Sequence, residues 1–180
     1  MGKSRRPWLR VSSICWGETR ALREECERLR GLLRRDELTG LLNRQGTLDE
    51  LERWDAQWTA VYLDVDDFKS LNDQLGHFGA DDVLRSIGAS LQAIASARLG
   101  IAGRLGGDEF VVCLPGYFNE LATARLLHTI RGGLEVRVSI GVARGASGAY
   151  EVLREADVAM YVDKRSRYRQ GTQRPGGHRC

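Results

Sequence analysis

The feature that most constrains this chain is an apolar run that stops at an acidic residue. Residues 59–63 read Thr-Ala-Val-Tyr-Leu, and Asp64 follows them directly. A short apolar run of this kind predicts a strand that is buried on both faces. Asp64 would then stand at the end of that strand, at the edge of a sheet. The fold must therefore place a carboxylate beside a hydrophobic core.

A second acidic point follows a pair of glycines. Residues 104–110 read Arg-Leu-Gly-Gly-Asp-Glu-Phe, with apolar runs on either side. Paired glycines supply the positive φ angles of tight hairpins, so we predict a hairpin that turns at Gly106 and Gly107. This turn would leave Asp108 and Glu109 in the open, where their charge needs a partner. We expect a divalent cation, because Mg2+ takes carboxylate oxygens and completes its shell with water or phosphate.

Strand and helix patterns alternate along the rest of the chain. The expected elements after Asp64 are a helix closed by Gly76, a second helix through Leu84 and Leu91, a hairpin over 100–105 and 110–114, a helix over 119–131, a strand over 134–142 and a helix over 150–167. This alternation predicts an α/β (α+β sandwich) fold, in which helices flank a central mixed β-sheet and the acidic turn lies on a β-hairpin.

Composition narrows the class of protein. At 180 residues with 42% hydrophobic content, the chain is long enough for one domain with a core. The net charge of +3 is concentrated in basic clusters at residues 3–6 and 164–169, which favours solvated ends over a nucleic-acid surface. The 4 cysteines lack CxxC spacing and no apolar stretch is long enough to span a membrane. We therefore expect a cytoplasmic protein with reduced thiols and with neither nucleic acid nor membrane as a partner.

The N-terminal region carries a separate signal. Residues 1–17 show no periodicity and are expected to be a disordered tail, or one foreign to the natural protein, and residues 170–180 a flexible tail. Over residues 18–35, a helix is predicted whose apolar seam is Leu22, Cys26, Leu29 and Leu33. Such a seam can pair with a second helix or pack on its own domain, since short isolated helices are marginal in water.

Simple structural roles compete with functional ones. Asp66 or Asp67 can cap the helix that follows, and a Gly-Gly-Asp-Glu hairpin can be an ordinary exposed turn. Other polar residues of the same region can be plain surface residues, namely Lys69, Asn72, His77 and Asp81. A functional role is favoured because all these motifs occur together and in order.

Five segments together resemble the signature blocks of the GGDEF family of diguanylate cyclases. They are residues 36–44, 63–77, 104–110, 139–143 and 156–161, and the resembling domain is expected over 36–169. The resemblance implies a palm-like fold, related to nucleotide polymerases, that condenses two GTP molecules into cyclic di-GMP and releases two pyrophosphates. The alternative is a catalytically silent GGDEF module that binds GTP or a cyclic dinucleotide as a regulatory domain.

The resemblance also implies a metal site. Two Mg2+ (or Mn2+) ions per active site would activate the ribose 3′-hydroxyl and neutralise the phosphates. The implied ligands are Asp64, the backbone carbonyl of Val65, Asp108 and Glu109. Asp108 is also the implied catalytic group that helps to deprotonate the hydroxyl, although a metal-bound carboxylate is a weak base. Gly106 and Gly107 would let the nucleotide approach the backbone closely.

The implied substrate residues follow position by position. Lys69 would stabilise the phosphate charge of the transition state. Asn72 and Asp81 would bind the guanine edge, and Asp81 favours GTP over ATP because guanine alone offers adjacent N–H donors. His77 would lie near the nucleotide, with a structural role in its loop as the alternative. Lys164 would bind a phosphate.

The resemblance further implies a homodimer, because one domain holds one GTP and supplies half of a two-fold site. The helix at 18–35 would then dimerise as a parallel coiled coil or convey a signal from an upstream sensor. Two departures from the family pattern stand out. Ala97 and Gly100 occupy the positions of an Arg-x-x-Asp product-inhibition site, so we expect no such feedback. Tyr168 replaces an expected phosphate-binding Arg, whose contact Arg167 or Arg169 would supply.

Overall fold

The computed structural model describes residues 20–22, 24–25, 31, 33–54, 57–134, 136–145 and 148–172, with side chains up to residue 167. It divides into two units, Met1–Arg34 and Arg35–Cys180. In the first unit the described residues before position 34 are helical, and Leu22 and Leu33 are exposed. The tail expected over residues 1–17 lies outside the described residues, as do Cys26 and Leu29.

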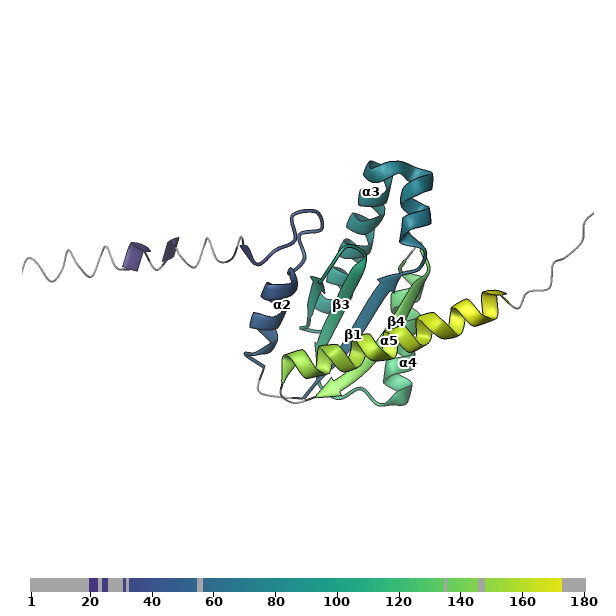
Figure 1. The fold of residues 1–180 in the computed structure, drawn as a ribbon. Helices are drawn as coiled ribbons and strands as arrows, with labels where there is room; N and C mark the ends of the chain where they lie inside the picture. The colour runs from purple at the N-terminus through teal and green to yellow at the C-terminus, as the bar shows by residue number, and fades with distance from the viewer. Residues whose placement is uncertain are drawn as a thin grey trace, which may run out of the picture. The chain divides into compact units, whose positions relative to one another are not determined.

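A four-stranded sheet forms the centre of the second unit (Figure 1). Its strands are β1 (Trp58–Val65), β2 (Ile101–Arg104), β3 (Glu109–Pro115) and β4 (Val138–Gly145), in the order β2-β3-β1-β4. The α+β fold class is confirmed, but all neighbouring strands are antiparallel where a mixed sheet was expected. The reason is that β3 returns between β1 and β2 and so separates two strands that run in the same direction. Among the described residues, parallel pairing is limited to one isolated bridge, between Leu42 and Gly103.

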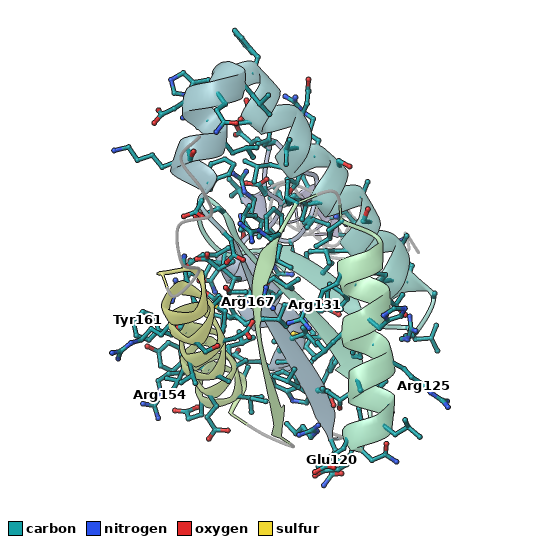
Figure 2. The ribbon with its side chains drawn as sticks, turned by 90° about the vertical axis from the view of Figure 1, so that its right-hand side faces the viewer. Glu120, Arg125, Arg131, Arg154, Tyr161 and Arg167 are labelled. Atoms are coloured by element: carbon teal, nitrogen blue, oxygen red, sulfur yellow. The ribbon has the colours of Figure 1, made fainter. Side chains whose placement is uncertain are left out.

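Helices cover both faces of this sheet. The helices α3 (Phe68–Ser96) and α4 (Glu120–Gly132) pack on one face, and α2 (Arg44–Leu51) and α5 (Ala149–Thr172) on the other. Figure 2 shows α4 and α5 on opposite sides of the sheet. Alternate β1 residues enter the two cores: Val61 and Leu63 pack with α3 and α4, and Trp58 and Tyr62 with α5. By the same alternation, Asp64 belongs to the α5 face.

Several predicted boundaries are confirmed. The backbone of α3 leaves helical geometry at Gly76, where φ is 71°, and a second helical arm follows. Asn119 caps α4, because its side chain accepts a hydrogen bond from the Ala122 N–H.

The strand expected from residue 134 begins only at Val138, since Val138 pairs with Val65, the last residue of β1. The preceding Leu134 packs against the core without joining the sheet.

The glycine turn differs from the tight turn that the sequence predicted. Four residues, 105–108, separate β2 from β3, and neither Gly106 nor Gly107 has a positive φ. A connection of this length does not need the left-handed conformation that a two-residue turn requires. A Cβ atom at Gly107 would meet nothing within 4 Å, whereas one at Gly106 would lie 2.7 Å from Glu109 Oε2. The turn therefore leaves open space above Gly107.

Candidate active site

The end of β1 and the start of β3 bring the predicted acidic residues together. Asp64 pairs in register with Glu109. The N–H of Val65 donates to the carbonyl of Asp108 at 3.2 Å, so Asp108 lies directly beside the end of β1. Asp64 is only 8% exposed. The sheet thus holds two carboxylates, Asp64 and Asp108, at one partly buried point.

These two carboxylates repel one another. The pKa of Asp108 is raised, first by burial and then by the negative charge of Asp64. Both effects disfavour a second negative charge at this point. A bound cation would relieve them, and the chemistry of the two side chains therefore suits a positively charged ligand.

Lys164 already supplies one positive charge there. Its Nζ atom donates to Asp64 Oδ1 at 2.5 Å, from α5 across to the end of β1. Burial alone would lower the pKa of Lys164, but the hydrogen bond with Asp64 and the charges of Asp64, Asp108 and Asp66 outweigh it, and the pKa is raised. Lys164, which was expected to bind phosphate, therefore lies at the acidic centre that Asp64 and Asp108 form.

A second cation of α5 reaches the same region. Arg167 Nη1 lies 3.7 Å from Asp66 Oδ2, and Arg167 Nε lies 3.1 Å from Asp163 Oδ2. Asp163 in turn accepts a hydrogen bond from the Ile140 N–H on the free edge of β4, and pairs with Arg131 at 3.6 Å. Figure 2 shows Arg167 and Arg131 approaching this edge from α5 and α4. Arg167 is therefore held next to the acidic centre.

The capping hypothesis for Asp66 and Asp67 is wrong. Asp66 Oδ1 accepts a hydrogen bond from Ser139 Oγ at 2.5 Å, which ties it to β4. Asp67 occupies the N-cap position of α3 without a side-chain capping hydrogen bond, and its φ is 55°. A left-handed conformation in a residue other than glycine is uncommon and tends to cluster at functional sites.

Glu109 acts electrostatically on Tyr62 of β1. The pKa of Tyr62 is raised by burial first and then by the negative charge of Glu109. Within the described part of the chain, no group of three or more His, Cys, Asp or Glu side chains is arranged to hold a metal. Asp64 and Asp108 still fit Mg2+, which commonly takes one or two carboxylates and completes its shell with water and substrate phosphates.

The predicted substrate residues lie on the two arms of α3. Lys69 and Asn72 belong to the arm before Gly76, and His77 and Asp81 to the arm after it. Lys69 and His77 are exposed, and Asn72 and Asp81 are half-buried. The four side chains have no hydrogen bond or ion pair to another described residue. They are thus available to a ligand.

Sequence reasoning missed one ion pair that holds the turn. Arg104 donates to Asp36 Oδ1 at 3.0 Å and to the Gly107 carbonyl at 2.6 Å. Burial would raise the pKa of Asp36, but hydrogen bonds from Thr39 and Arg104 outweigh it and the pKa is lowered. The sequence showed an arginine just before the two glycines, but it did not indicate that the distant Asp36 would be the partner of Arg104.

Comparison with known proteins identifies relatives. The family profile described as "Diguanylate cyclase, GGDEF domain" matches residues 33–170. "Probable diguanylate cyclase DgcC" of Escherichia coli K12 is 32% identical over 165 residues, which are 81% of this chain and 44% of that protein. "Cyclic di-GMP phosphodiesterase PdeB" of Shewanella oneidensis is 33% identical over 146 residues, 72% of this chain and 17% of that protein. The chain thus spans less than half the length of these relatives.

Solved structures agree with the fold. The coiled coil and GGDEF domain of DgcB from Caulobacter crescentus, in complex with c-di-GMP, has a TM-score of 0.70 and 28% identity, covering 89% of this chain and 96% of that one. The diguanylate cyclase SiaD from Pseudomonas aeruginosa, in complex with its activator SiaC, has a TM-score of 0.69 and 28% identity. The match covers 88% of this chain and 68% of that one. Among the described residues, no helix combines the length and apolar character that crossing a membrane requires.

Proposed function

Because this chain belongs to the GGDEF domain family, we propose that it condenses two GTP molecules into cyclic di-GMP and releases two pyrophosphates. One observation carries this proposal: Asp64 and Asp108 meet at the end of β1, with Lys164 directed at them from α5. A degenerate module that had lost its chemistry would not need to keep two mutually repelling carboxylates together.

Asp64, the Val65 carbonyl and Asp108 would hold Mg2+ (or Mn2+), with two ions per active site and Glu109 as a further ligand. When bound, such ions supply positive charge that neutralises the phosphates and makes the ribose 3′-hydroxyl more acidic. Asp108 accepts the proton of that hydroxyl.

The cations of the site orient the nucleotide. Lys164 and Arg167 lie three residues apart on α5, so they share one side of the helix and can both contact the triphosphate. Lys69 would contact it from α3. Arg167 would take the place of the Arg that the family has at Tyr168, whose side chain lies outside the described residues.

The two arms of α3 would hold the base. Asp81 accepts from guanine N1–H and N2–H2, and Asn72 completes the contact, so that ATP is excluded for lack of these donors. His77 lies at the break between the arms and would border the nucleotide. Gly107 leaves the space above the turn free for it, and Gly106 would let the nucleotide approach the backbone beside Glu109.

Catalysis would require a second copy of the chain, since each domain carries one GTP. The copies would face one another across a two-fold axis. The DgcB structure contains a coiled coil together with a GGDEF domain. In this chain Leu22 and Leu33, which both lie among the described helical residues of the first unit, are exposed. Both observations support a parallel coiled coil as the dimerising element.

The second candidate is a silent regulatory module. PdeB carries a segment similar to this chain as a small part of a protein named for the opposite activity. In that reading the domain binds GTP or a cyclic dinucleotide and signals through its N-terminal helix.

The deciding experiment is incubation of the purified protein with GTP and Mg2+, with the products resolved by chromatography. An Asp108→Ala variant removes the proposed base, and Glu155→Ala, an exposed carboxylate on α5, is the matched control. Cyclic di-GMP from the wild type and the control, but not from Asp108→Ala, supports the cyclase. Lack of product in a sample that binds GTP by calorimetry, even with a strong dimeriser fused ahead of Glu18, supports the silent module instead.

A further inference from the structure

A groove opens beside the glycine turn. Its volume is about 480 Å3, within the range of small-molecule sites, and its lining residues are Asp36, Asn43, Arg44, Gln45 and residues 104–107. One wall comes from the segment around Leu42, whose N–H donates to Ala102 and whose carbonyl accepts from Arg104, along the outer edge of β2. The helix α2 contacts β2 on this side (Figure 1).

Arg44 gives the groove a cation without a partner. Arg104 is held by Asp36 and by the Gly107 carbonyl, and Gln45 donates to Asp49. Arg44 is exposed and has no hydrogen bond or ion pair to any residue that the structure describes. An exposed guanidinium that has no hydrogen bond or ion pair within the described part of the chain, and that interacts there only electrostatically with Tyr62, suits a phosphate group, because its fork of N–H donors matches the phosphate in geometry.

The order of the strands fixes the position of this groove relative to the acidic centre. The hairpin turn joins β2 to β3, and β3 lies between β2 and β1. Asp64 and Lys164 meet at the end of β1, whereas the groove lies along the outer edge of β2. The glycine turn therefore stands between the acidic centre and the groove.

The stereochemistry of phosphoryl transfer gives the groove a role. In an in-line displacement the attacking oxygen and the leaving group lie on opposite sides of the phosphorus. If Lys164 and Arg167 hold the departing pyrophosphate on the β1 side, the attacking 3′-hydroxyl must arrive from the β2 side, where Arg44 lies. In a two-fold dimer that hydroxyl belongs to the nucleotide of the second copy.

We propose that this groove receives the ribose-phosphate part of the GTP carried by the second copy, and that Arg44 binds a phosphate oxygen of that nucleotide. The inference rests on the proposed cyclase function. The new bond joins the 3′-oxygen to the α-phosphorus, the bond to the pyrophosphate oxygen breaks, and the proton passes to Asp108. Arg44 takes no part in proton transfer; it positions the incoming nucleotide, and its site is incomplete without the second copy.

The test separates binding of a domain's own nucleotide from turnover by the dimer. The variants are Arg44→Ala and Arg44→Lys, and the control is Arg53→Ala, which removes an exposed arginine paired with Glu50 just after α2. Turnover is the rate of cyclic di-GMP formation at saturating GTP. Affinity is measured on dilute, monomeric protein with a GTP analogue that carries a methylene bridge between the α- and β-phosphorus. Thermal melting by circular dichroism checks that each variant is folded.

We expect Arg44→Ala to lower turnover roughly 10- to 100-fold, as for the loss of a charged hydrogen bond, while monomer affinity for the analogue stays at the wild-type value. Arg44→Lys should recover part of the rate, and Arg53→Ala should match the wild type. If Arg44→Ala turned over GTP at the wild-type rate, the inference about the groove would be wrong, but the proposed cyclase function would not be affected. A parallel fall in monomer affinity would also overturn it, because Arg44 would then serve its own domain's nucleotide. A wild type that binds GTP but makes no product, even with a strong dimeriser fused ahead of Glu18, would overturn both proposals.

Discussion

Arg104 and Asp36 join the glycine turn to the start of the second unit. Their side chains meet at 3.0 Å and are only 12% and 23% exposed, although 68 positions separate them in the sequence. Arg104 also donates twice to the carbonyl of Gly107, at 3.0 and 2.6 Å. One guanidinium thus fixes the turn that carries Asp108 to the start of this unit.

This ion pair predicts a pH-dependent loss of stability. The pKa of Asp36 is lowered from 3.8 in the folded protein, so its contribution to stability is present above pH 3.8 and is lost as the pH falls through the lower folded-state value. Asp36→Asn should reduce the free energy of unfolding by about 1–3 kcal/mol at pH 7. Urea unfolding of both proteins at pH 7 and at pH 3 measures this difference. A difference that did not shrink at the lower pH would contradict the prediction.

The two cations of α5 should each contribute to GTP binding. Lys164→Ala and Arg167→Ala remove groups directed at the acidic centre, and each should weaken GTP affinity roughly 10- to 100-fold. Arg165→Ala is the control, since Arg165 stacks 5.8 Å from the ring of Tyr161 instead. Calorimetry with a non-reacting GTP analogue gives the affinities. Equal affinities for the Arg165 and Arg167 variants would rule out the assigned role of Arg167.

Two glycine substitutions should separate stability from activity. A Cβ atom at Gly141 would overlap the backbone of Ala156 and Met160, so Gly141→Ala should push α5 from β4 and cost about 1–3 kcal/mol or more. Gly107→Ala meets open space and should change stability by no more than about 0.5 kcal/mol. Its cyclic di-GMP formation should nevertheless fall, because the methyl group occupies the space above the turn. Thermal melting and product assays of both variants check this contrast.

Base selection should depend on Asp81. Asp81→Asn replaces a pure acceptor by a group that also donates, and it should weaken GTP binding roughly 10- to 100-fold while leaving weak ATP binding unchanged. The neighbouring Asp82→Asn is the matched control, since Asp82 is exposed and pairs with Arg85. Competition binding with both nucleotides measures the ratio. If the Asp81→Asn variant preferred GTP as strongly as the wild type does, Asp81 would not be a guanine-binding residue.

Product feedback should be absent at the positions of the Arg-x-x-Asp site. Ala97 replaces the arginine, and at Gly100 even a Cβ atom would overlap the carbonyl of Cys113 and the side chain of Leu114. No aspartate fits there without moving β3. Initial rates with added cyclic di-GMP should therefore show no tight non-competitive inhibition, and such inhibition would require a different binding site.

The sequence predicted those features that short stretches of chain encode. The apolar run before Asp64 became β1, Gly76 broke α3, and the helix expected over 119–131 formed as α4, because periodicity and side-chain chemistry act over a few neighbouring residues. The resemblance to known motifs named the acidic residues, and the structure brought Asp64 and Asp108 together.

Tertiary structure alone decided how distant segments meet. The return of β3 between β1 and β2 made the sheet antiparallel, and the length of the loop removed the need for positive φ at Gly106 and Gly107. The contact of Lys164 with Asp64 spans 100 positions. Such contacts depend on strand register and on how helices pack across the sheet. The local pattern of residues predicts the strands and helices themselves, but it predicts neither their register nor their packing.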